Sequence, residues 1–204
     1  SDFEKKSALE HKICAEDKLQ VIRNGIDFEE IHCVRQKMRS EIGIPEDAFV
    51  VGQIGRLTAQ KSPDMFVKMA KEIKRKVDKA FFLMIGERLQ RKETEMMITE
   101  AGLKDCTFIT GWVDNPLDYV GCIDVSVLLS RWEGFGLVLP EYMLISKPIV
   151  ASNVDAIPEI IQDGVNGLLV EIEDYYGAAE AVVRLHDDPE LREYLVENEV
   201  KIES

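Results

Sequence analysis

Residues 49–70 read FVVGQIGRLTAQKSPDMFVKMA, and this stretch decides the fold. It begins with a strand of buried type at 49–55 and continues into a helix, with Ser62 as the expected N-cap and Pro63 at the first helical position. The face that this helix turns to the core is formed by Phe66, Met69, Ala70, Ile73 and Val77. Strand, loop and helix in this order form the repeating unit of a parallel α/β sheet.

The same alternation continues to the end of the chain. Further strands are expected at 80–85, 106–109, 123–129, 148–151 and 167–170, helices at 89–101, 137–144, 157–161, 175–186 and 191–196, and a helical turn at 116–120. Short apolar strands without polar alternation indicate a sheet that is buried on both faces. The sequence therefore predicts a doubly wound, Rossmann-like parallel α/β sheet, in which ligands bind at the carboxyl ends of the strands.

The chain before residue 49 departs from this rhythm. A helix is expected at 2–13, a brief strand at 19–22, a turn at Asn24-Gly25 and a second helix at 29–42. The first residue is not a methionine, so we expect the sequence to be part of a longer protein.

Composition limits the kinds of partner. The 204 residues include 38 acidic and 25 basic side chains, a formal net charge of −13 at pH 7. This acidity argues against nucleic acid as a partner and against broad docking on anionic lipid, because both depend on contacts with phosphate. It leaves room for a small phosphate-bearing ligand at a local site.

Cysteine usage and the short apolar runs favour the cytoplasm. The longest apolar run, 80–85, has six residues, far below the ~20 needed to span a bilayer, and no signal peptide is recognisable. The cysteines show no CxxC pair, so neither a disulfide framework nor a zinc site is indicated, and a reducing compartment is expected. They are Cys14, Cys33, Cys106 and Cys122.

The strongest candidate site follows the strand at 123–129. Residues 130–136 read SRWEGFG, and a Gly-x-Gly turn before a helix presents free N–H groups and the positive end of the helix dipole to an anion such as phosphate. Glu133 and Glu141 flank this turn, where carboxylates suit the hydroxyls of a sugar or ribose. A plainer interpretation stays open, in which Glu141 favours its own helix dipole and Glu133 is solvated.

A second candidate site, GRLTAQK at 55–61, follows the first strand. Arg56 and Lys61 lie at the carboxyl end of that strand and just before a helix, where two cations suit a pyrophosphate. Taken alone, they could be ordinary surface cations. Because the loops after parallel strands meet at one edge of the sheet, we expect both candidate sites to face the same edge.

Five motifs, in order along the chain, resemble the retaining glycosyltransferases of the GT-B fold in family 4, also called glycosyltransferase group 1. They are VIRNGID at 21–27, GRL with a following lysine at 55–61, GWV at 111–113, EGFG with a second glutamate at 133–141, and PE with DGVNGLLV at 158–170. The resemblance implies the C-terminal, donor-binding half of a GT-B fold. Residues 1–20 would then be the linker or the end of an absent N-terminal domain, and 21–204 the Rossmann-like donor domain.

The resemblance implies a role for each motif. Arg56 and Lys61 would bind the donor diphosphate and neutralise it as it leaves, while Glu133 would contact hydroxyls of the donor sugar. Glu141 would accept from the ribose diol. The remaining donor-binding residues would hold the sugar, the phosphates and the nucleobase, largely through their backbone: Gly55, Val113, Gly134, Phe135, Gly136 and Leu137.

The resemblance also implies an activity. The enzyme would move a sugar from a nucleotide diphosphate sugar, preferably a UDP-sugar, to an acceptor hydroxyl with retention, in cell-surface polysaccharide or glycolipid synthesis. No metal and no other cofactor is implied, because fixed cations and dipoles can stabilise the leaving diphosphate. The acceptor saccharide or glycolipid would bind the absent domain, so this fragment alone is expected to be inactive. The full-length enzyme is expected in the cytoplasm, with peripheral contact at the inner membrane face, and its oligomeric state stays open.

Two positions depart from the family pattern. Ser62 stands where glycine is common after the lysine, and its hydroxyl is expected to cap the helix with little loss. Asp155-Ala156 stands where a Gly-Gly pair is usual, so bulk and negative charge are expected near the diphosphate, with an effect on donor affinity or sugar preference. Two other functions stay open: a non-catalytic sugar-nucleotide binding module, and a sugar-nucleotide epimerase of the same fold.

Overall fold

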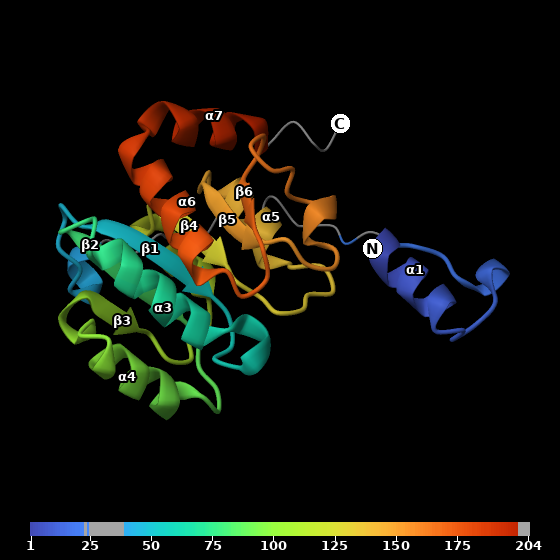
Figure 1. Ribbon diagram of the computed structural model, residues 1–204, viewed down its shortest axis with the longest axis horizontal. Helices are drawn as coiled ribbons and strands as arrows, with labels where there is room; N and C mark the ends of the chain where they lie inside the picture. The colour runs from blue at the N-terminus through green and yellow to red at the C-terminus, as the bar shows by residue number, and fades with distance from the viewer. Residues whose placement is uncertain (23, 25–38, 200–204) are drawn as a thin grey trace.

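The computed structural model describes residues 1–22, 24 and 39–199, and these form a six-stranded sheet in which all neighbouring strands are parallel (Figure 1). In spatial order its strands are β3 Thr107–Ile109, β2 Ala80–Ile85, β1 Phe49–Ile54, β4 Val125–Leu128, β5 Ile149–Ser152 and β6 Leu168–Val170. This order is that of the Rossmann fold. The predicted doubly wound parallel sheet is therefore confirmed.

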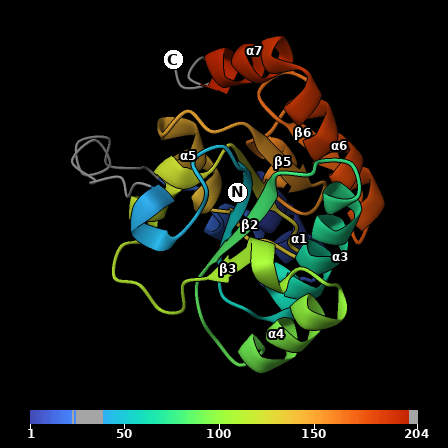
Figure 2. The same cartoon turned by 90° about the vertical axis from the view of Figure 1, so that its left-hand side faces the viewer.

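Helices cover both faces of the sheet (Figure 2). One face carries α3 Pro63–Lys74, α4 Arg91–Glu100, α6 Tyr175–Asp187 and α7 Pro189–Glu199, and the other carries α5 Val138–Leu144 with the 3-10 segments η5 Pro116–Cys122 and η6 Ile157–Glu159. Side chains alternate across a strand, so Val51 packs into the first core and Val50 into the second. Strands buried on both faces need apolar residues at nearly every position, which is the pattern in the sequence.

Most of the predicted elements are present, with shifted ends. The helical turn predicted at 116–120 is the 3-10 segment η5, and the short helix predicted at 157–161 is the 3-10 segment η6, each with proline in its first turn. The predicted strand at 19–22 is wrong, because these residues join no described strand and a lone strand has no partner for its backbone groups. Further 3-10 segments are η1 Glu16–Lys18, η3 Ala59–Lys61 and η4 Lys104–Cys106.

Two predictions fall mainly on residues that the structure does not describe. The helix expected at 29–42 lies outside the described residues except for its end, where η2 Arg39–Ile42 is a 3-10 segment. The NGID turn at 21–27 likewise lies outside them, apart from residues 21, 22 and 24.

Ser62 begins α3 but does not cap it as expected. Its side chain accepts no hydrogen bond from the first turn; the hydroxyl donates instead to the carbonyl of Ala59 at 3.3 Å. The backbone of Ser62 has φ of +51°, the left-handed region in which a side chain is unfavourable. This conformation gives a physical reason for glycine at the position, and the hydroxyl offsets part of the cost through its hydrogen bond.

Helix α1, Asp2–Glu10, stands to one side of the sheet (Figure 1) and has no buried side chain. The carboxylate of Glu159 accepts the backbone N–H groups of Asp2 and Phe3 at 3.1 and 2.6 Å. These bonds join the start of α1 to the 3-10 segment η6. The division of the chain at residue 20 stays a prediction.

Candidate functional site at the carboxyl edge of the sheet

The loops after β1 and β4 meet at the carboxyl edge of the sheet. These strands are neighbours, yet the next strand after β1 lies on one side and the next after β4 on the other. Ligands of open α/β sheets bind at such a switch point. The loop after β1 carries Arg56 and Lys61, and the loop after β4 carries Glu133, so the expectation of a common edge is confirmed.

Lys61 and Glu133 form an ion pair across this switch point. Nζ of Lys61 contacts Oε2 of Glu133, and the hydroxyl of Ser130 donates to the same oxygen at 3.0 Å. Glu133 is only 9% exposed, so water screens the attraction weakly. Lys61 is therefore not an ordinary surface cation, and Glu133 is not a solvated carboxylate, as the two plainer interpretations had them.

Further hydrogen bonds tie the two loops together. The backbone N–H of Arg131 donates to the carbonyl of Gln60 at 2.9 Å, and the Gln60 side chain donates to the carbonyl of Trp132 at 3.1 Å. Within β1, the buried Gln53 side chain donates to the carbonyl of Lys61 at 2.7 Å. The loops are therefore fixed relative to each other independently of the ion pair.

The guanidinium of Arg131 is a further connection, which the sequence interpretation missed. It donates to both carboxylate oxygens of Asp64 at 3.0 and 2.8 Å, to the carbonyl of Ala59 at 3.0 Å and to Glu173 at 2.8 Å. The hydrogen bond with Asp64 is the main cause of a raised pKa at Arg131. Arg131 stands in the motif around Glu133, but the sequence did not show its partners, because only the fold brings them to it.

The turn at 134–137 presents backbone donors that the protein does not use. The N–H groups of Gly134, Phe135, Gly136 and Leu137 donate to no acceptor among the described residues. Helix α5 begins directly after the turn, so the positive end of its dipole adds to the potential there. The turn has the donor arrangement that the sequence interpretation expected for an anion.

Glu141 lies in the first turn of α5 and is partly buried. Burial raises the pKa of its carboxyl group. Its carboxylate has no hydrogen bond or ion pair with any other described residue. The position agrees with a helix-dipole role, but a partly buried carboxylate without a partner costs stability, which points to a ligand that supplies the missing donors.

Glu141→Gln is expected to raise thermal stability at pH 7 and to weaken nucleotide binding. A carboxyl group whose pKa is raised in the folded state stabilises the fold at pH values below its unfolded pKa, near 4.5. That contribution is lost as the pH rises through the folded pKa. The gain in melting temperature from the amide should therefore shrink toward zero below about pH 4.5. Thermal melts from pH 4 to 8 measure this, and a gain that is equal at every pH would contradict the assignment.

Arg56 lies on the same loop as Lys61 but outside the ion pair. Its side chain is exposed, and its guanidinium donates to Oε1 of Gln60 at 3.1 Å. Gly55 lies against the stem of Lys61, because a Cβ at Gly55 would come 3.2 Å from Cγ of Lys61. Arg56 is thus an exposed cation at the edge of the site, whereas the ion pair with Glu133 holds the ammonium group of Lys61 in place.

Val113 lies farther along the same edge, after β3. It lines a hollow of about 350 Å³ together with residues of 112–119, and Trp112 there is 77% exposed. Within the described part of the chain, no hydrogen bond or ion pair joins Val113 to the Lys61–Glu133 pair. The structure therefore brings Lys61 and Glu133 together directly, and Val113 shares only their edge of the sheet.

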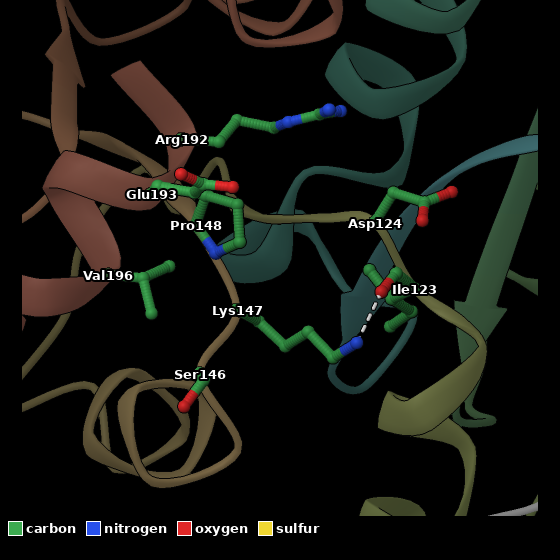
Figure 3. A pocket seen from close by; sticks show the side chains of 8 residues that line it. All are labelled: Ile123, Asp124, Ser146, Lys147, Pro148, Arg192, Glu193 and Val196. Carbon is green, nitrogen blue, oxygen red and sulfur yellow. Dashed lines mark hydrogen bonds between the residues drawn. The ribbon is translucent and has the colours of Figure 1, made fainter. Parts of the chain in front are cut away.

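A second hollow, of about 310 Å³, lies at the opposite edge (Figure 3). Ile123 and Lys147, which precede β4 and β5, line it with residues of α7. Nζ of Lys147 donates to the carbonyl of Ile123 at 2.7 Å, and burial lowers the pKa of Lys147. Because it lies at the amino ends of the strands, this hollow is separate from the predicted site.

The part of the chain at residues 1–22, 24 and 39–199 has no group of three or more His, Cys, Asp or Glu side chains that could hold a metal ion. None of its helices is long and apolar enough to cross a bilayer. Cys14 and Cys106 are free thiols.

Comparison with known proteins points to one family. A family model described as Glycosyl transferases group 1 matches residues 34–201. Alpha-D-kanosaminyltransferase from Streptomyces kanamyceticus is 33% identical over 166 residues, covering 80% of this chain and 43% of the relative. Lipopolysaccharide core biosynthesis glycosyltransferase LpsD from Rhizobium meliloti is 32% identical over 157 residues, covering 77% and 45%. The chain thus spans less than half the length of these curated relatives.

A solved structure shares the fold. The crystal structure of Anabaena Alr3699/HepE in complex with UDP and glucose matches with a TM-score of 0.86 at 23% identity. The match covers 97% of this chain and 55% of that one. At this identity the likeness establishes a common fold over nearly the whole chain.

Proposed function

The chain belongs to the glycosyl transferases of group 1 and has the α/β fold of their GT-B members, and we propose that it is the donor-binding part of such an enzyme. The donor is a nucleoside diphosphate sugar, with a UDP-sugar preferred. The sugar passes to an acceptor hydroxyl with retention and without a divalent metal. The Anabaena protein of similar fold was crystallised with UDP and glucose, which supports the choice of nucleotide.

One observation carries the proposal. At the switch point between β1 and β4, a cationic side chain, two carboxylates and a turn of unused backbone donors converge on one edge. Cations and N–H groups suit the diphosphate, and carboxylates suit the hydroxyls of sugar and ribose. A nucleoside diphosphate sugar is the ligand that offers both kinds of group in one molecule.

The charges of the site suit a departing diphosphate. Lys61 has three N–H donors, so it can keep its contact with Glu133 and still donate to a phosphate oxygen. Arg56 is exposed and adds a bidentate donor, while the N–H groups of 134–137 add fixed dipoles. Donors already in place where charge develops stabilise the transition state without reorganisation.

Glu133 is suited to hold the donor sugar. Its Oε2 accepts from Lys61 and Ser130, whereas its Oε1 has no partner among the described residues. A sugar hydroxyl can donate to this free oxygen. Because Lys61 touches the other oxygen, the same carboxylate would keep the sugar and the diphosphate cation in a constant relative position.

Acceptor recognition belongs to the rest of the longer protein in this proposal. The acceptor is a saccharide or glycolipid of surface polysaccharide synthesis, and the whole enzyme works in the cytoplasm and at the inner membrane face. A relative named for lipopolysaccharide core biosynthesis supports this choice. Membrane contact of the whole enzyme is peripheral in this proposal.

Calorimetry with UDP, GDP and ADP tests donor binding directly. The wild-type chain is to be compared with Glu141→Ala, and each titration repeated in EDTA. We expect UDP to bind best, the variant to bind all three more weakly because the ribose diol loses its acceptor, and EDTA to change nothing. If no nucleotide binds, both a transferase domain and a sugar-nucleotide binding module are wrong.

The 204-residue chain is expected to bind a UDP-sugar without transferring the sugar. The physical reason is that the acceptor must be held in line with the donor, and the proposal places that task outside this chain. The measurement is transfer of radiolabelled sugar to a mixed saccharide acceptor, with binding confirmed in the same sample. Robust transfer would contradict the assignment of the acceptor site.

A further inference from the structure

Asp155 places another carboxylate beside Glu133. It lies in the loop after β5, the strand next to β4, and its Oδ2 accepts the backbone N–H of Glu133 at 2.7 Å. The φ of Asp155 is +49°, a left-handed conformation that is unfavourable for most side chains and least so for Asn and Asp. The charge-assisted hydrogen bond offsets this cost. It also holds the carboxylate against the candidate site.

The charges around Glu133 do not balance. Lys61 neutralises Glu133 through their ion pair. Asp155 forms no ion pair with any described cation, and its Oδ1 has no hydrogen-bond partner among the described residues. Asp155 therefore places an uncompensated negative charge next to the residue proposed to hold the donor sugar.

We propose that Asp155 selects the donor sugar by charge, excluding sugars that carry a carboxylate, such as hexuronic acids, and admitting neutral and amino sugars. The inference rests on the proposed function, because it requires the sugar to lie against Glu133. A carboxylate on the sugar would meet Asp155 in a partly buried place, where like charges repel more strongly than in water. A hydroxyl or an ammonium group can instead donate to the free Oδ1.

The test compares UDP, UDP-glucose, UDP-glucosamine and UDP-glucuronic acid by calorimetry on the wild-type chain and on Asp155→Asn. Asparagine keeps the size of the side chain, tolerates a left-handed backbone and can accept the hydrogen bond from Glu133 through its amide oxygen, so mainly the charge changes. Asp188→Asn is the matched control, because Oδ1 of Asp188 also accepts a backbone N–H, that of Leu191 at 2.9 Å, before α7.

In the wild type, UDP-glucuronic acid is expected to bind at least roughly tenfold more weakly than UDP-glucose, the difference that one close like-charge pair can produce. UDP-glucosamine should bind at least as tightly as UDP-glucose. In Asp155→Asn, the affinities for all three sugars should converge to within about threefold of one another, because the charge that separates them is gone. Any gain in affinity for UDP itself should be smaller than the gain for UDP-glucuronic acid, because the proposal sets the sugar, not the diphosphate, against Asp155. Asp188→Asn should behave as the wild type.

The possible results of this test distinguish charge selection by Asp155 from the proposed function on which it rests. An unchanged preference in Asp155→Asn overturns charge selection. An equal loss for UDP and every UDP-sugar also overturns it and makes Asp155 a structural support of Glu133. Wild-type protein that binds no UDP overturns the proposed function instead, and thermal melts of each variant show whether it is folded.

Discussion

Lys61→Met is expected to weaken UDP binding about 10- to 150-fold, the range for losing one hydrogen bond to a charged group. Methionine keeps the length of the side chain and removes the ammonium that would meet the diphosphate. Uridine has no phosphate, so its affinity should not change. Calorimetry with UDP and uridine measures both, and an equal loss for the two ligands would refute the phosphate assignment.

Lys61→Met also leaves the carboxylate of Glu133 buried without its cation, which lowers stability on its own. Lys61→Met/Glu133→Gln removes both charges, so it should recover melting temperature without recovering UDP affinity. Arg56→Met should weaken UDP binding without loss of stability, because Arg56 is exposed. Lys71→Met, on the exposed side of α3, is the matched control and should bind UDP as the wild type does.

Tyr142→Phe is expected to lower the free energy of unfolding by about 1–3 kcal/mol, the cost of leaving a buried donor unpaired. Tyr142 is fully buried on α5, and its hydroxyl accepts the backbone N–H of Ile54, the last residue of β1, at 2.7 Å. The paired ladder between β1 and β4 ends at Gly52 and Ser126, so Ile54 lies beyond it and the Tyr142 hydroxyl supplies the acceptor for its N–H. Urea unfolding of the two proteins measures the difference.

The effect of Tyr142→Phe should also depend on pH in a defined direction. Burial raises the pKa of Tyr142, so the folded chain keeps its proton while the unfolded chain releases it. This contribution to stability is fully present below the unfolded pKa, near 10, and is lost as the pH rises through the folded pKa. The phenylalanine variant lacks that decline, so the difference in free energy of unfolding between the two proteins should narrow above pH 10.

Tyr194→Phe is the control for this substitution. Tyr194 lies on α7 with 51% of its surface exposed, and its hydroxyl holds no backbone donor among the described residues. Removal of this hydroxyl should change the free energy of unfolding by less than about 0.5 kcal/mol, as is usual for surface substitutions. A similar loss at both positions would show that the hydrogen bond to Ile54 contributes little.

Local pattern was enough to predict most of the sheet. The apolar runs at 49–54 and 80–85 need no partner to be recognised, because burial on both faces leaves few other residue types acceptable. The predicted strand at 19–22 failed for the opposite reason, since a short apolar run becomes a strand only beside another strand. The side-chain cap predicted at Ser62 was wrong because the sequence shows a residue type that favours capping but does not show the φ of that residue.

The candidate site was predicted in outline and completed by contacts. The rule that loops after parallel strands share an edge placed the loops of Lys61 and Glu133 at one edge, but it did not predict their ion pair. Arg131 had no predicted role, because its partner Asp64 lies 67 residues away in the chain. Asp155 stood out as a departure from a family pattern, but its hydrogen bond to Glu133 joins loops 22 residues apart.

Most of the strands and helices, the order of the five motifs and the chemistry of their side chains followed from the sequence, because these depend on residue type and on neighbours within a few positions. The tertiary structure alone decided which charges are neutralised and which are not. Lys61 and Glu133 are 72 residues apart, and they pair because β1 and β4 lie side by side. Asp155 keeps its charge uncompensated for the same physical reason: strand order, not spacing in the chain, sets which loops meet.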